Sequence, residues 1–169
     1  PMGLQYSITA IGSVILQISV NNLGTVAVAA VTAASKLSMV FACVFDALAT
    51  TMATFAGQNV GAKKLDRINQ GLRSAGLVGI VYCLLAFLTM WLAGKQLISL
   101  FVSAGDTEVI EKAYRFLLIN GAFYIPLLFV NIVRLSIQGM GFTQMAVLAG
   151  VFEMIARTLV AVFLVPNFG

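Results

Sequence analysis

One stretch decides how this chain folds: Gln58-Asn59-Val60-Gly61-Ala62-Lys63-Lys64-Leu65-Asp66-Arg67. It is the only dense cluster of charge between long apolar runs. Hydrophobic residues make up 60% of the chain and charged residues only 9%, whereas soluble domains carry about 25% charged residues. The composition therefore predicts an all-α bundle of transmembrane helices, and the quoted stretch is a basic connector that faces water.

Five apolar runs surround this connector, each near or above the roughly 20 residues that a helix needs to cross the hydrocarbon core. The predicted spans are 1–22, 26–56, 75–93, 113–138 and 143–165. Charged and apolar side chains alternate over residues 63–74, which predicts a short helix on the cytoplasmic membrane surface, with an ordinary solvated loop helix as the alternative. Because carriers are commonly built from paired repeats, five spans lead us to expect residues 1–169 to be part of a larger protein.

Basic residues give the orientation of the spans. Lys63, Lys64, Arg67 and Arg73 lie between the second and third spans, and Arg134 lies near the end of the fourth. By the positive-inside rule these ends face the cytoplasm. The net charge of +4 follows from this bias, so we expect no nucleic acid partner. We expect an integral protein of the bacterial cytoplasmic (inner) membrane, with lipid around it.

The residue types argue against an enzyme. The chain has no histidine, and Cys43 and Cys83 show no metal-ligand or redox spacing. No glycine-rich loop opens onto a lysine followed by serine or threonine, so the usual carrier of nucleotide binding is absent. We therefore expect no catalytic residue, no metal and no cofactor, and we interpret both cysteines as small core residues.

Polar residues recur every three or four positions on three of the spans, which places each set on one helix face. The sets are Gln5, Thr9, Ser13, Gln17 and Asn21 on the first span, Thr32, Lys36, Met39, Cys43, Asp46, Thr50 and Thr54 on the second, and Asn120, Tyr124, Asn131, Arg134 and Gln138 on the fourth. Residues 75–93 offer little polarity, so this span is expected to be peripheral and to face lipid.

Charges inside the spans need partners or a cavity, because a lone charge at the bilayer centre costs about 2.5–3.5 kcal/mol on insertion scales. Glu153 and Arg157 are four residues apart and can pair along one face. They either neutralise each other or also shape the field of a cavity. Lys36 and Asp46 lie about 15 Å apart along a helix, too far to pair. Asp46 is the best candidate for a proton or cation site, whereas Arg134 is interpreted as reaching the cytoplasmic interface.

Taken together, the motifs resemble those of the multidrug and toxic compound extrusion (MATE) transporters, specifically their carboxyl-terminal lobe. The motifs are, in chain order, Pro1-Met2-Gly3-Leu4-Gln5, Gly12 with Gln17, Asn21 and Gly24, Ala29-Ala30, Gly57-Gln58-Asn59-Val60-Gly61-Ala62 with Arg67 and Gly71, Gln138-Gly139-Met140-Gly141, and Glu153 with Arg157. The resemblance covers nearly the whole chain. It implies helices seven to eleven of a twelve-helix carrier, so an amino-terminal lobe and a last helix are expected partners.

The resemblance implies a secondary active transporter that exports organic cations or other amphipathic compounds by alternating access, in exchange for H⁺ or Na⁺. We expect the following residues to line or support its cavity: Gln5, Gln17, Asn21, Lys36, Asp46, Asn120, Glu153 and Arg157. Asp46 and Glu153 are those whose protonation is expected to change during transport. Some members bind an ion through an acidic residue on the first helix of this lobe, but here that helix carries only neutral polar residues.

The glycines of the shared motifs have an expected structural use. Gly57 and Gly61 bracket the cytoplasmic end of the second span, where Gln58 and Asn59 can satisfy exposed backbone groups before Ala62. Gly139 and Gly141 are expected to turn the fourth span into the fifth.

Two alternatives to an exporter are a lipid-linked sugar flippase of the same superfamily and a structural membrane subunit. A flippase would use a more basic cavity, for which Lys36 and Arg157 are available, but the segment from Gln58 to Ala62 argues against it. A structural subunit would not need repeated polar stripes. A membrane-embedded prenyl or acyl transferase would need clustered acidic motifs or a histidine at a helix end, and the sequence has neither.

Overall fold

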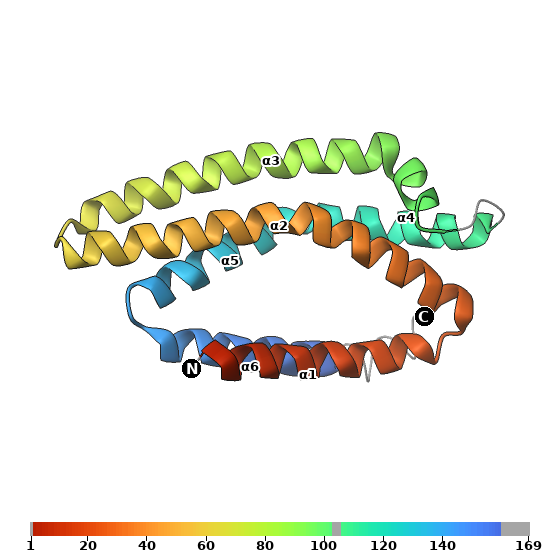
Figure 1. Ribbon diagram of the computed structural model, residues 1–169, viewed down its shortest axis with the longest axis horizontal. Coiled ribbons are helices and arrows are strands. Elements are labelled where there is room, and N and C mark those ends of the chain that lie inside the picture. The colour runs from red at the N-terminus through yellow and green to blue at the C-terminus, as the bar shows by residue number, and fades with distance from the viewer. Residues whose placement is uncertain (1, 103–105, 160–169) are drawn as a thin grey trace.

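The computed structural model describes residues 2–102 and 106–159 (Figure 1). The described residues form an all-α bundle without strands, which confirms the predicted fold class. Its helices are α1 (Met2–Asn21), α2 (Thr25–Gly61), α3 (Leu65–Ser99), α4 (Thr107–Ala122), α5 (Tyr124–Gly139) and α6 (Thr143–Leu159).

The helices differ in whether they are long enough to cross a membrane. In the described residues α2 and α3 are long and apolar enough, and α4 with α5 qualifies as one bent span. The 37 residues of α2 extend about 55 Å, well beyond a hydrocarbon core of about 30 Å. The apolar parts of α1 and α6, Ala10–Asn21 and Thr143–Ala156, are shorter. Five membrane crossings therefore stay a prediction.

The prediction of a separate surface helix over 63–74 is wrong. Leu65 begins α3, which continues without a break to Ser99. No proline interrupts this stretch, and the helix keeps one buried face from Ile68 through Ala75 to Gly79, so nothing in the chain ends it after residue 74. The turn before it is formed by Lys63 and Lys64, and Lys63 has a φ of 55°.

The fourth predicted span, over 113–138, corresponds to two helices that together qualify as one bent span. The helical segment begins earlier, at Thr107, and breaks at Phe123, where α4 and α5 meet at an angle of 52°. Pro126 explains the break, since it has no N–H to donate and its ring collides with the carbonyl of the residue four positions earlier, Ala122. The fifth span begins at Thr143 as predicted, and its expected end at residues 160–165 lies outside the described residues.

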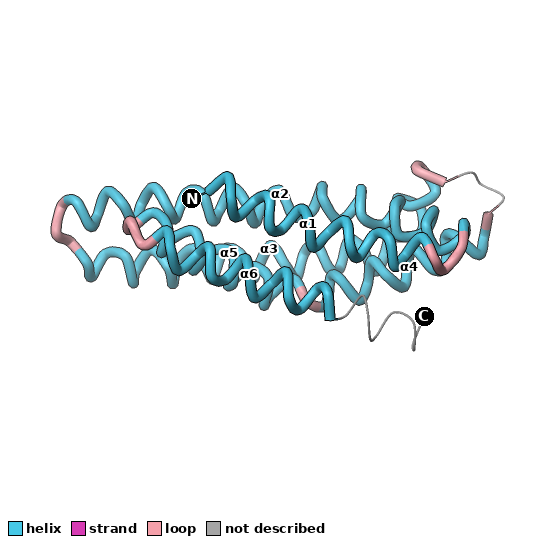
Figure 2. Tube along the Cα trace, turned by 90° about the horizontal axis from the view of Figure 1, so that it is seen from below, coloured by secondary structure: helices cyan, strands magenta, loops and turns pink. Residues whose placement is uncertain are grey.

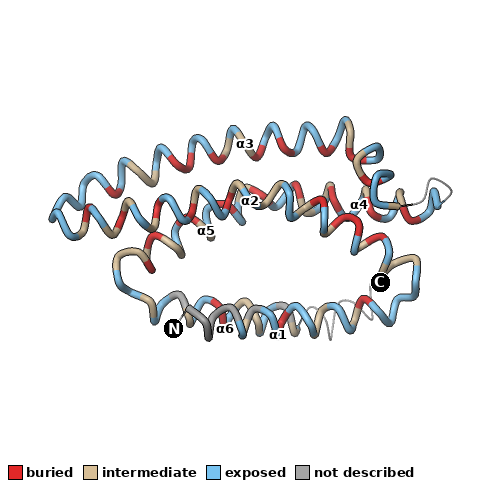
Figure 3. Tube along the Cα trace, in the orientation of Figure 1, coloured by how far each residue is buried: buried red, intermediate tan, exposed pale blue. Residues whose placement is uncertain are grey.

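The core lies between α2, α3, α4 and α5, which we call the four-helix core. Its largest fully buried apolar side chains are Phe45, Met90, Ile98, Leu117, Leu128 and Ile132. Small residues on α3 let the helices approach closely, as in many membrane bundles. A Cβ on Gly79 would collide with the side chain of Leu128, and one on Gly94 would lie 2.9 Å from the ring of Tyr114. Figure 3 shows that buried residues gather on the facing sides of these helices.

The remaining helices, α1 and α6, pack side by side and form a second layer, which we call the two-helix layer (Figures 1 and 2). The outward face of α3, on the far side of the molecule, carries exposed apolar residues such as Leu84, Trp91 and Leu92. This face agrees with the expectation that the third span is peripheral and faces lipid.

Candidate functional site

A polar groove runs along the exposed face of α2. It has a volume of about 720 Å³ and is lined by Asp46, Ala47, Thr50, Thr51, Thr54, Phe55 and Gln58. The spacing of three or four residues places these positions on one side of the helix, while Phe45, Ala49, Met52 and Ala56 face the core. The polar stripe predicted for the second span therefore lies on the outside of the four-helix core.

The groove presents oxygen lone pairs more than N–H or O–H donors. The Thr51 hydroxyl donates to the carbonyl of Ala47 at 2.8 Å, and the Thr54 hydroxyl donates to that of Thr50 at 3.2 Å. Because both protons are used within the helix, the hydroxyl oxygens offer acceptors to the groove. The exposed Asp46 carboxylate adds negative charge. Such a surface favours a cation over an anion.

A second groove lies between α5 and α6 and has a volume of about 730 Å³. Its walls are mostly apolar, from Val130, Val133 and Ile137 on α5 and from Met145 and Ala149 on α6. The volume falls within the roughly 300–1,000 Å³ of typical small-molecule pockets. A mainly apolar groove with few polar groups suits the body of an amphipathic molecule.

The polar groups of this second groove are an ion pair between the two helices. The Arg134 Nη1 lies 3.2 Å from the Glu153 Oε2, and the two side chains are 22% and 34% exposed. The Arg134 Nη2 also donates to the Asn131 Oδ1 at 3.2 Å, while its Nε is buried without a hydrogen-bond partner among the described residues. The interpretation that Arg134 reaches the cytoplasmic interface stays a prediction; the structure adds that Glu153 on the next helix is its partner.

Arg134 is the site residue that the sequence reasoning missed. Glu153 was expected to pair with Arg157 on its own helix, and the side chain of Arg157 lies outside the described residues. The signal for Arg134 was present in the sequence: a cation within the fourth span, three residues after Asn131, with a carboxylate on the next span. Sequence spacing favours partners on one helix, so a pair across two helices was overlooked.

The other predicted cavity residues do not form one site: Gln17 and Asn21 contact each other on α1, and the rest lie on other helices. On α1 the Gln17 Nε2 donates to the Asn21 Oδ1 at 3.1 Å on an exposed face, and the side chain of Gln5 lies outside the described residues. Lys36 is exposed on α2, and Asn120 is half-buried on α4. The six candidates whose side chains are described thus lie in the two grooves (Asp46 and Glu153), on the exposed faces of α1 and α2 (Gln17, Asn21 and Lys36) and on α4 (Asn120).

The glycines of the shared motifs mark the closest approach of two helices. A Cβ on Gly57 of α2 would lie 2.8 Å from the carbonyl oxygen of Gly139 on α5, and a Cβ on Gly139 would collide with the backbone of Ala53. Gly57 therefore serves helix packing rather than the turn that we expected. Gly141 does form the turn after α5, with a φ of 98°, as expected. Gln138 beside it is buried.

The end of α2 is closed by backbone groups. The N–H groups of Ala62 and Lys64 donate to the carbonyls of Gln58 and Asn59 at 3.0 and 2.9 Å. The buried Asn59 Nδ2 donates to the Phe55 carbonyl at 2.8 Å. The last helical position is Gly61, and Arg67 is exposed in the first turn of α3. The Asn59 side chain therefore donates to a carbonyl within α2 and not to a backbone group at the end of the helix.

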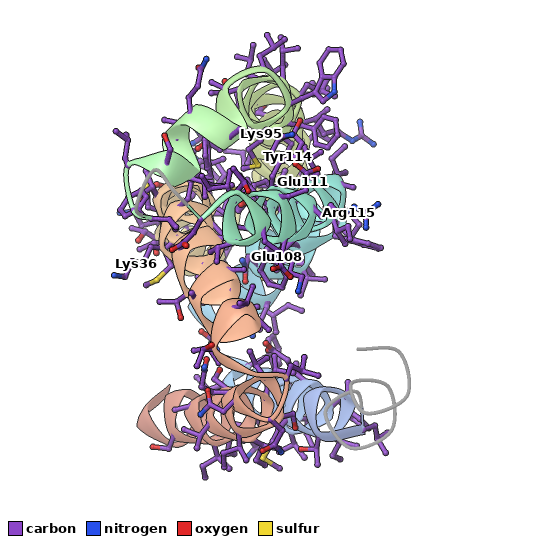
Figure 4. The ribbon with its side chains drawn as sticks, turned by 90° about the vertical axis from the view of Figure 1, so that its right-hand side faces the viewer. Lys36, Lys95, Glu108, Glu111, Tyr114 and Arg115 are labelled. Atoms are coloured by element: carbon purple, nitrogen blue, oxygen red, sulfur yellow. The ribbon has the colours of Figure 1, made fainter. Side chains whose placement is uncertain are left out.

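A charged cluster joins α3 to α4 at the opposite end of the core, where Figure 4 shows Lys95, Tyr114 and Glu111 together and Lys36 apart from them. The Lys95 Nζ lies 2.6 Å from the Glu111 Oε2 and 5.2 Å from the centre of the Tyr114 ring. The hydrogen bond to Glu111 raises the pKa of Lys95, and the same bond lowers the pKa of Glu111. Both groups are exposed, so the cluster is a surface ion pair that connects α3 to α4.

An all-α membrane bundle with a cation-favouring groove and a partly buried ion pair between α5 and α6 has the features of a membrane transporter. The MatE family model matches residues 1–163. The chain belongs to this family, the MATE transporters, and is an integral membrane protein of a class that carries out transport rather than catalysis. No curated protein and no solved structure matches the chain significantly.

Proposed function

We propose that this chain forms one lobe of a secondary active exporter that carries organic cations, or other amphipathic compounds, out of the cell in exchange for H⁺ or Na⁺. The observation that carries the proposal is the groove on α2, where Asp46 shares one helix face with the acceptor oxygens of Thr51 and Thr54. A carboxylate among acceptors attracts a cation, and the apolar groove between α5 and α6 suits the apolar body of an amphipathic compound.

Exchange follows if substrate and coupling ion compete for one carboxylate. Asp46 bound to H⁺ or Na⁺ loses its attraction for an organic cation, and an organic cation bound at Asp46 excludes the ion. Glu153 would act in the same way only while its pairing with Arg134 is broken. No cofactor enters this scheme, since the ion gradient supplies the free energy.

The exposed position of the groove fits a cavity between two lobes. The polar side chains of the α2 stripe would be costly against lipid, so we infer that an amino-terminal lobe and a last helix complete the transporter and enclose this face. Membrane lipid would instead cover the apolar face of α3. We place the protein in the bacterial inner membrane, where gradients of both ions exist.

The test is efflux of a fluorescent organic cation from cells that express the complete gene, with the proton and the sodium gradients collapsed separately. Efflux that stops when one gradient is collapsed, and persists when the other is, identifies the coupling ion and supports the proposal. Efflux that survives the loss of both gradients contradicts ion-coupled exchange. No efflux under any gradient contradicts export of cations and points to the lipid-linked sugar flippase.

A further inference from the structure

The two-helix layer is attached to the four-helix core at few points. The buried hydrophobic residues of the described chain come almost entirely from α2–α5, and Val20 is the member from α1. Helices α1 and α6 pack on each other, and Gly12 of α1 and Gly150 of α6 are buried, which is typical of helix pairs held by small residues. Figure 4 shows the layer end-on, set apart from the other helices. The layer therefore packs more on itself than on the core.

Two turns connect the layer to the core, and both contain a glycine with a positive φ. Gly24 joins α1 to α2 with a φ of 96°, and Gly141 joins α5 to α6 with a φ of 98°. An added Cβ would meet no atom within 4 Å at either position. Glycine tolerates a wide range of backbone angles, and open surroundings leave room for change. Both connections therefore have the properties of hinges.

The Arg134 and Glu153 pair adds an ionic contact between the layer and the core. Asn131 holds the guanidinium on the side of α5, and the same guanidinium reaches Glu153 on α6. Two other ion pairs of the described residues lie within the core: Lys95 and Glu111 connect α3 to α4, and Lys112 and Glu108 lie within α4. The pair is also more buried than either of these, so solvent screens it less.

We propose that the Arg134–Glu153 ion pair is a latch that holds the two-helix layer against the four-helix core. When the latch opens, α1 and α6 move as one unit about Gly24 and Gly141, and the groove between α5 and α6 widens. The closed arrangement leaves the Arg134 Nε without a partner, which is a cost that water relieves when the groove opens. The free-energy difference between the two arrangements is thereby reduced.

The test is a distance measurement by pulsed electron paramagnetic resonance on the full-length transporter in lipid. Spin labels replace exposed residues in a background that carries Cys43→Ser and Cys83→Ala. The pair Leu148 and Val81 reports the distance between the layer and the core. The pair Ile18 and Leu148 reports the distance within the layer.

In the wild type we expect one narrow distribution of layer-to-core distances. In Glu153→Gln and in Arg134→Gln we expect this distribution to become broader and to include longer distances. The distribution within the layer stays unchanged. Glu111→Gln, which breaks an exposed ion pair within the core, is the matched control and leaves both distributions as in the wild type. Arg134→Glu combined with Glu153→Arg restores the narrow distribution; if this double variant does not insert, the two single variants decide the test.

Three results would overturn the proposal. The first is an unchanged layer-to-core distance in both single variants. The second is a change within the layer of the same size, because α1 and α6 would then not move as one unit. The third is an equal effect of Glu111→Gln. The readout is a distance and not transport, so it can fail while the proposed export activity holds, and it can succeed while that activity fails.

Discussion

The close approach of α5 to α2 at Gly139 makes a sharp prediction for Gly139→Ala. The added Cβ would collide with the carbonyl oxygen of Ala53 and lie 2.6 Å from its carbonyl carbon, whereas ordinary contact begins at 3.4 Å, so α5 must move away from α2 by more than about 0.8 Å. The obstructing atoms belong to the backbone, so no side chain can rotate out of the way. Overpacking of this kind costs about 1–3 kcal/mol and occasionally more.

The assay is thermal unfolding of the purified full-length transporter in detergent. A loss of 1–3 kcal/mol lowers Tm by roughly 2–12 °C at about 2–4 °C per kcal/mol. Gly61→Ala is the matched control, because it adds the same methyl group at the last position of α2, where no atom lies within 4 Å. A Tm of Gly139→Ala within a degree of both the wild type and this control would refute the close packing of α2 on α5.

Three further predictions follow from single contacts or groups. Asp46→Asn should abolish gradient-driven efflux of an organic cation while membrane insertion stays normal, whereas Asp66→Asn in the exposed first turn of α3 should leave efflux unchanged; equal efflux from the two variants removes Asp46 from the mechanism. Gly141→Ala should destabilise the protein by about 1–2 kcal/mol in the same thermal assay, since an L-residue is strained at a φ of 98°, and an unchanged Tm would contradict that backbone conformation. Glu111→Gln should lower Tm slightly at neutral pH. This difference in Tm should vanish as the pH falls through the pKa of Glu111, which Lys95 holds below its ordinary value of 4.5. A difference in Tm that persists in acid would mean that the Lys95 pair is not its cause.

The features that the sequence predicted correctly depend on local periodicity. The stripe of α2 recurs every three or four residues, and this period alone places Asp46, Thr50 and Thr54 on one helix face. A turn at Gly141 was likewise expected, because glycine commonly follows the end of a helix. Such properties belong to one segment and its neighbours along the chain. They can be predicted without knowledge of the tertiary structure.

The features that were predicted wrongly or missed depend on how long a helix continues or on which helices meet. Charge over 63–74 indicated a surface element, but charged residues do not end a helix, and α3 begins at Leu65. Pro126 was inside a predicted span and breaks it. The contact of Gly57 with Gly139 and the pair of Arg134 with Glu153 join positions on different helices. Their partners depend on helix packing, which periodicity does not specify.

The two outer faces of the four-helix core differ in chemistry, and this difference constrains what surrounds each. The face of α3 presents apolar side chains such as Leu84 and Leu92, which lipid solvates well. The stripe of α2 presents Asp46 and threonine oxygens, and lipid provides no hydrogen bonds to them. Between the helices, small residues such as Gly57, Gly139 and Gly79 allow close packing. The polar groups of this α2 stripe lie outside the interior and are disfavoured in lipid, so water or another part of the transporter is the favourable cover for them.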